Sequence, residues 1–278
     1  MTWRRSLCTK ALALALWAGA AWSEPAIFAE TQAGAAALRD MYAGGVQFFK
    51  DQYDVKVPQG FALIAATGPA ALRAQIAQAG LRAGVGFDDA RVCPARRVGG
   101  VAGRSFVALC WNAGPERSDH ARAVMVHELM HQVQYTLARD RPARRSGDDW
   151  LLGPAWLLEG SAEWVEEVFR NGRASDGVRL FALQEPARRN QTALSELQVH
   201  GTMVDGRVYG VGRFAAYLLA ERVGDAALFA YWAALGRTRD REAAFAEAFG
   251  MTLDDFQRDF AAIRRHYGDA RRWAGVAE

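Results

Sequence analysis

The stretch from Ala121 to Thr136 contains no proline or glycine and carries the pattern His127-Glu128-x-x-His131. Apolar residues recur along it at helical spacing, which predicts an α-helix. Histidines four residues apart on a helix project from one face, so both imidazoles can bind a single zinc ion while Glu128 stands beside it. The fold is therefore expected to bring a third ligand to this helix from elsewhere in the chain.

A second predicted helix runs from about Ala155 to Phe169 and carries Glu159 and Glu163 one turn apart. Glu159 lies between large apolar neighbours, where an unpaired carboxylate would be costly to bury. We therefore expect Glu159 to be the third zinc ligand, which leaves one position for a water molecule. Glu163 can orient one histidine through its second ring nitrogen, although spacing alone also allows the two glutamates to exchange roles. The acids at 166 and 167 are expected to face the solvent.

These residues predict a hydrolase that cleaves a peptide bond. Zinc brings the pKa of a water molecule towards ~7, and Glu128 can take the proton as the water attacks a carbonyl carbon. Glu128 can then deliver the proton to the leaving amine. Two other classes stay open, namely a zinc hydrolase of a non-peptide amide such as a cell-wall crosslink, and a noncatalytic peptide-binding protein of the cell envelope. The intact Glu128 favours an enzyme, since a binding protein needs no base.

The histidine pattern, together with the sequence W-L-L-E-G at residues 156–160, resembles the gluzincin metallopeptidases, which include thermolysin-like and aminopeptidase-like enzymes. The resemblance implies zinc as cofactor, a zincin-like active-site cleft, and Glu159 as the third ligand. The thermolysin-like group also places an acid four residues after that glutamate to orient a histidine. Glu163 matches this acid in position, although the group uses aspartate.

Outside the zinc segment the resemblance is partial. The sequence Y-G-V-G that starts at Tyr209 resembles the Y-x-x-G of the aminopeptidase branch, which implies that the Tyr209 hydroxyl stabilises the oxyanion. His200 is the alternative donor, because thermolysin-like enzymes use a histidine. The clan also implies that a strand at Ser105 to Trp111 forms the edge of the sheet and pairs with an extended substrate.

The chain departs from the aminopeptidase branch in one informative place. That branch carries G-x-M-E-N before the zinc helix, and its glutamate holds the free amino terminus of the substrate. This chain has Gly99 to Gly103 instead, with no acid until Glu116. An endopeptidase is therefore favoured over an aminopeptidase. A polar insertion from Arg139 to Asp149 is expected to rim the cleft.

Residues 1–23 have the form of an export signal, with three basic residues, an apolar stretch, and a small-x-small cleavage site at Ala21-Trp22-Ser23. The apolar stretch is too short to span a bilayer, so cleavage and export to a periplasm or the outside are expected, without a stable membrane anchor. Removal of this segment leaves 31 basic and 31 acidic residues. Balanced charge, with no basic patch interleaved with aromatics, argues against nucleic-acid binding.

The predicted fold class is α+β, with a small mixed sheet and its helices packed against a mostly helical C-terminal half. The expected division is a signal at 1–23, an α/β subdomain at 24–115 and a helical zinc-binding subdomain at 116–278. Cys93 and Cys110 are expected to form a disulfide after export. Further elements are predicted as helices at 29–53, 69–80, 212–222, 226–235, 241–249 and 253–267, and as a strand at 61–65.

Overall fold

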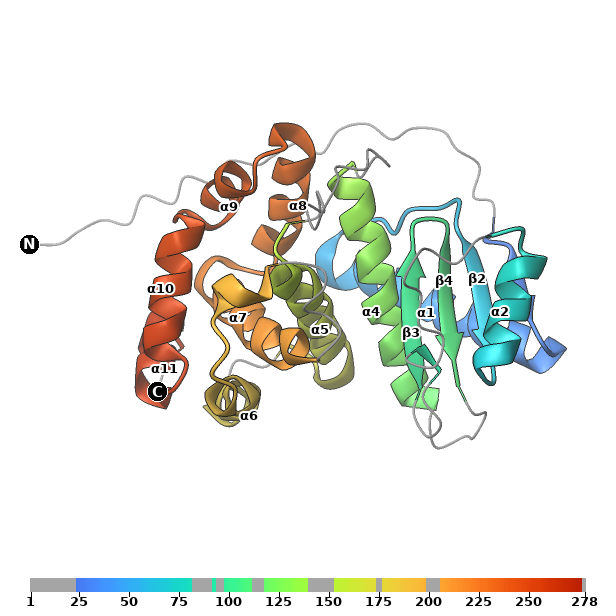
Figure 1. The fold of residues 1–278 in the computed structure, drawn as a ribbon, viewed down its shortest axis with the longest axis horizontal. Coiled ribbons are helices and arrows are strands. Elements are labelled where there is room, and N and C mark those ends of the chain that lie inside the picture. The colour runs from blue at the N-terminus through green and yellow to red at the C-terminus, as the bar shows by residue number, and fades with distance from the viewer. Residues whose placement is uncertain are drawn as a thin grey trace, which may run out of the picture.

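The computed structural model describes residues 24–81, 92–93, 98–111, 118–139, 153–173, 177–198 and 206–276. Within these ranges the fold is α+β, with a four-stranded mixed sheet beside a larger set of helices (Figure 1). This confirms the predicted class. The predicted export signal, His200 and residues 140–149 of the predicted insertion lie outside the described residues.

The sheet has the strand order β1-β2-β4-β3. Its strands are β1 (Ile27–Ala29), β2 (Ala62–Ala66), β3 (Gly99–Gly103) and β4 (Phe106–Cys110). The first three in that order run parallel, and β3 pairs antiparallel with β4. The strand expected at the edge is therefore interior, and the prediction was wrong. All residues of β4 are buried, as in a strand covered on both faces, whereas glycine-rich β3 is half-buried and forms the edge.

Helices cover both faces of the sheet. Helix α1 (Gln32–Tyr53) and helix α4 (Ser118–Leu137) pack on the face that receives Leu63, Ala65 and alternate residues of β4. Helix α2 (Pro69–Gln78) covers the opposite face. This alternation follows from the two-residue period of a strand. Helix α4 therefore lies between the sheet and the helical half, as Figure 1 shows.

The helical half follows α4 in the chain. It comprises α5 (Ala155–Asn171), α6 (Gly177–Arg189), the 3-10 helix η2 (Leu194–Leu197), α7 (Arg207–Val223), α8 (Ala226–Thr238), α9 (Arg241–Phe249), α10 (Leu253–Ile263) and α11 (Tyr267–Ala274). The single helix predicted at 253–267 is thus two helices. At the break, Arg264 donates to the carbonyls of Gln191 and Thr192, and its own carbonyl accepts from Gln184. These long-range contacts have no local sequence signal.

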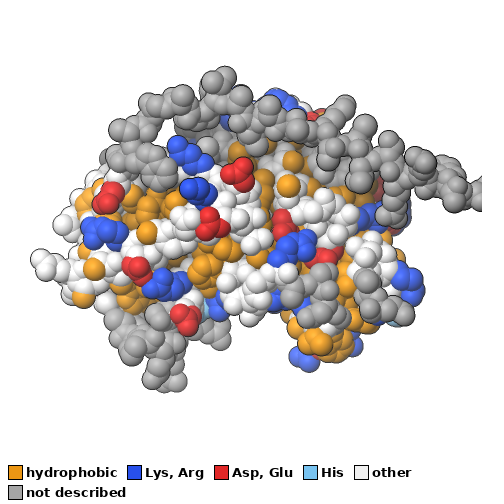
Figure 2. Space-filling model, turned by 180° about the vertical axis from the view of Figure 1, so that it is seen from behind, with side chains coloured by type: hydrophobic (Ala, Val, Ile, Leu, Met, Phe, Trp, Pro, Cys, Tyr) orange, Lys and Arg blue, Asp and Glu red, His pale blue; other side chains and the backbone are white. Residues whose placement is uncertain are grey.

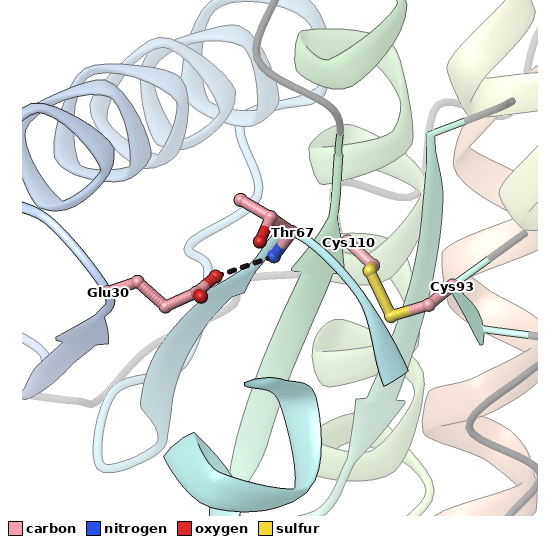
Figure 3. Close-up of a disulfide and its surroundings, with 4 residues drawn as sticks. All are labelled: Glu30, Thr67, Cys93 and Cys110. Atoms are coloured by element: carbon pink, nitrogen blue, oxygen red, sulfur yellow. Dashed lines mark hydrogen bonds between the residues drawn. A yellow bond between two sulfur atoms is a disulfide. The ribbon is translucent and has the colours of Figure 1, made fainter. Parts of the chain in front are cut away.

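A disulfide joins Cys93 to Cys110 on β4, as predicted (Figure 3). The two cysteines are 17 residues apart, and closing a loop of this size in the unfolded chain is worth about 3 kcal/mol in the chain-entropy model. We expect Cys93→Ser to lower the free energy of unfolding by this order, as measured by urea denaturation. Dithiothreitol should reproduce the loss in the wild-type protein. Two freely alkylated thiols in the native, unreduced protein would contradict the assignment.

Figure 3 also shows a contact between the ends of neighbouring strands, where the Thr67 backbone N–H donates to Glu30 Oε2 over 2.7 Å. Over the surface in Figure 2, acidic and basic side chains are interspersed. None of the helices in the described ranges is long and apolar enough to cross a membrane.

Candidate metal centre

Three buried side chains converge between α4 and α5. His127 and His131 project from one face of α4, and Glu159 reaches them from the first half of α5. The two Nε2 atoms lie 3.2 Å apart, and Glu159 Oε2 lies 3.3 Å from the first and 3.5 Å from the second. The predicted histidine and glutamate set is therefore brought together by the fold.

The spacing of these three atoms fits a tetrahedral zinc ion. Zinc bonds of 2.0–2.1 Å to nitrogen and oxygen place neighbouring ligand atoms about 3.3–3.4 Å apart in a tetrahedron. The observed separations of 3.2, 3.3 and 3.5 Å bracket this value. Two imidazoles and one carboxylate are a ligand set that zinc uses in catalytic sites. The residues present thus suit the ion that the sequence predicts.

The outer nitrogen of each imidazole is already occupied by an acceptor. His131 Nδ1 lies 2.7 Å from Gln134 Oε1, and His127 Nδ1 lies 3.2 Å from Glu166 Oε2. A proton on each Nδ1 satisfies these acceptors and leaves both Nε2 lone pairs aimed at the shared centre. In this arrangement two lone pairs and a carboxylate face one another, and they could hold a cation between them.

The charges around the centre also favour a positive charge at this position. Burial lowers the pKa of both imidazoles, but the carboxylates beside them raise it above the ordinary histidine value. Burial raises the pKa of Glu159, yet His131 and His127 hold it well below its usual range. Each shift stabilises positive charge at the centre against a negative carboxylate. A divalent cation would meet the same demand with a single ion.

Glu166, rather than Glu163, is the carboxylate nearest to His127 Nδ1. Glu163 Oε1 lies 3.8 Å away, whereas Glu166 Oε2 lies at 3.2 Å, and the other oxygen of Glu166, Oε1, pairs with Arg170. Burial raises the pKa of Glu166, but the hydrogen bond from His127 and the guanidinium lower it to about 2. The expectation that Glu166 faces solvent was therefore wrong. Seven residues nearly complete two helical turns, so Glu166 returns to the face of Glu159.

Gln134 has a role that sequence reasoning missed. It is fully buried, accepts from His131, and donates from Nε2 to Leu158 O at 2.9 Å and to Ser161 Oγ at 2.8 Å. One amide therefore orients His131 on α4 and holds the turn of α5 that contains Glu159. A polar residue three positions after a ligand lies on the same helix face, which was the available signal.

We expect Gln134→Leu to weaken zinc binding about 10–100-fold, because a partner that orients a ligand typically contributes this much. Competition with a chromophoric chelator measures the change. Gln132→Leu is the matched control, since this buried glutamine on the same helix donates to Gly103 O and Phe106 O and not to a histidine. Equal losses in both variants would show that Gln134 acts only through general stability.

Glu128 stands between the two histidines in sequence and is 5% exposed. Burial raises the pKa of its carboxyl, whereas His127 and His131 oppose that rise. A carboxyl whose pKa moves towards neutrality is a better proton acceptor under physiological conditions. Its burial beside the two histidines would therefore suit it for proton transfer to a group held at the centre.

Tyr209 is brought to the centre by a close crossing of α5 and α7. A Cβ on Gly160 would lie 2.2 Å from Gly212 O, and a Cβ on Gly212 would lie 2.3 Å from Trp156 O. Only glycine allows the two backbones to approach so closely. Tyr209 lies one turn before Gly212, and its ring centroid is 6.4 Å from that of His127. Gly160, which follows Glu159, thus allows α7 to pack closely against α5, and this packing places Tyr209 near His127.

Glu163 lies next to Glu166 on the outer side of His127. It lies 3.8 Å from Arg213 Nη1, which also approaches Glu167 at 3.6 Å. Burial raises the pKa of Glu163, and neighbouring Glu166 adds to this rise. A second trio of possible ligand atoms, from His127, Glu163 and Glu166, shares the outer nitrogen of that histidine. The inner trio is buried and supplies two imidazoles, whereas both carboxylates of the second trio are partly exposed, so the inner trio is the stronger candidate.

Comparisons with protein-family models, with curated proteins and with solved structures found no match to this chain. Its function is therefore inferred from the geometry of the centre and the chemistry of the residues around it. The resemblance to gluzincins stays a prediction that is based on short sequence patterns.

Proposed function

We propose that this chain is an exported zinc metallopeptidase that hydrolyses peptide bonds, with an endopeptidase favoured over an aminopeptidase. The convergence of two Nε2 atoms and one carboxylate oxygen at 3.2–3.5 Å carries this proposal. Zinc at this position would polarise a carbonyl and acidify a water molecule. A set of three protein ligands leaves one position for water or substrate, which is typical of catalytic rather than structural zinc.

Glu128 acts as the proton carrier in this proposal. Its carboxylate takes a proton from the attacking water and delivers it to the amine that leaves when the carbon–nitrogen bond breaks. Gln134 and Glu166 hold the ligand imidazoles by their Nδ1 atoms and fix the direction of each ring. The chain thus supplies a base, two oriented imidazoles and a carboxylate ligand within a single buried site.

Export is supported by the disulfide between Cys93 and Cys110, because such bonds persist in oxidising compartments. The absence of an acid in β3, where an aminopeptidase holds the substrate amino group, supports internal cleavage. Glycine-rich β3 is the edge strand of the sheet and runs beside α4, so it takes the place in which an extended peptide would pair.

Mass-spectrometric profiling of a mixed peptide library tests the proposal. We expect the purified protein to cleave internal bonds, to lose the activity with a chelator and to regain it with zinc. Terminal trimming would instead indicate an aminopeptidase. If the zinc-loaded protein cleaved no peptide in the library, the result would contradict the proposal and favour a hydrolase that acts on a non-peptide amide.

Tyr209 is the proposed oxyanion donor, because its ring lies beside that of His127 at the start of α7. We expect Tyr209→Phe to lower kcat about 100-fold, the loss typical of one preorganised donor, while KM changes little. Steady-state kinetics measures this change, with Tyr217→Phe as a matched control on the same helix, because its buried hydroxyl has no hydrogen-bond partner among the described residues. An unchanged kcat would transfer the role to another donor such as His200.

A further inference from the structure

Edge strand β3 leaves a space that is filled by the carboxylate of Glu128. A Cβ on Gly100 would lie 2.6 Å from Glu128 Oε1 and 2.8 Å from Glu128 Cγ. It would also lie 2.8 Å from Val124 Cγ1, one helical turn earlier on α4. Real side chains do not approach this closely, so an L-residue with a side chain at position 100 would compete with Glu128 for the same volume.

The backbone of β3 is held in place on both sides. It pairs along its length with β4, and two side chains of α4 hold its far end. Gln132 Nε2 donates to Gly103 O over 2.6 Å, and the Tyr135 hydroxyl donates to Ala102 O over 3.1 Å. The strand therefore cannot withdraw from α4 without losing these bonds. The side chain of Glu128, which can change its rotamer, is the part that can move.

We propose that Gly100 is a positioning residue for Glu128, an inference that rests on the proposed peptidase function. Glycine weakens a strand, and its presence inside one often marks a close approach of another group. Here the absent side chain lets the Glu128 carboxylate stand against the strand. Substitution of Gly100 by alanine turns the carboxylate away while the ligands His127, His131 and Glu159 keep their contacts.

We expect Gly100→Ala to lower kcat about 100-fold, the effect of displacing a reacting group by roughly 1 Å, with KM and zinc affinity little changed. Gly103→Ala is the matched control, because its Cβ would meet the Phe106 ring and not Glu128. The control should be destabilised in thermal unfolding yet keep most of its kcat. Equal kcat losses in both variants, or wild-type kcat in Gly100→Ala, would overturn the inference.

A double-mutant cycle separates this inference from the proposed function. Gly100→Ala should lower the melting temperature of the metal-free protein, and a large part of that shift should vanish in a Glu128→Ala background, where the contacts with Glu128 are gone and only the contact with Val124 remains. If no peptide is cleaved but the coupling is present, the peptidase proposal fails and the contact of Gly100 with Glu128 stands. Additive shifts would overturn the contact, and with it the positioning role, whatever the activity.

Discussion

Replacement of Glu128 by glutamine should abolish peptide hydrolysis while the protein stays folded and retains zinc. Glutamine keeps the size of the side chain but accepts no proton at neutral pH, and general acid–base catalysis typically contributes 10²–10⁴-fold. The side chain is buried beside the proposed ligands, so a water molecule from the bulk solvent does not readily replace its carboxylate as the base. Initial rates on a substrate found in the peptide library, with zinc content measured in parallel, give the result.

The Glu128→Gln variant also controls for contaminating proteases, because it differs by a single functional group. A conservative Glu128→Asp variant should recover only part of the rate, since its carboxylate is one methylene shorter. Full activity in Glu128→Gln would rule out the proposed base. A loss of zinc in the same variant would mean that Glu128 serves the metal and not the proton transfer.

Glu159→Gln should weaken zinc binding by more than about 100-fold, the upper range for a residue that only orients a ligand. Its carboxylate supplies the negative charge of the inner trio, and an amide oxygen supplies none. Glu163→Gln is the matched control, because it makes the same change one turn later on α5, 3.8 Å from the outer nitrogen of His127. Calorimetric zinc titration of both variants measures the difference.

This pair of variants distinguishes the two assignments that spacing alone allows. A strong loss in Glu159→Gln, with a loss in Glu163→Gln below the roughly tenfold lower limit for a residue that orients a ligand, supports the inner trio. The reverse order would make Glu163 the ligand and Glu159 its helper. Equal, small effects in both would show that zinc binds elsewhere.

Local patterns predicted most of the helices. Helix α9 begins and ends where its apolar spacing and flanking Asp240 and Gly250 indicate, with Asp240 accepting from the first turn. The histidines were assigned to one face of α4 from their spacing, and the structure places both there. Strand β1 was missed because three residues carry too little periodicity to read, and its last residue, Ala29, was assigned to the following helix.

The errors concern relations between distant segments. The sequence from Phe106 to Cys110 predicts a strand, but its place in the sheet depends on which strands pair with it, and a uniformly apolar run was the signal for an interior position. Glu166 was misplaced because its partner His127 lies on another helix. Gln134 was missed because its structural role depends on hydrogen bonds to Leu158 and Ser161, which only the fold brings near.

X-ray absorption spectroscopy at the zinc edge tests the central claim most directly. The protein should retain one zinc ion per chain, with a first shell of nitrogen and oxygen at about 2.0–2.1 Å that includes two imidazoles. Glu159→Gln should lose this signal in proportion to its weaker affinity. Failure of the wild-type protein to retain zinc, or a first shell with sulfur at about 2.3 Å, would contradict a centre built from His127, His131 and Glu159.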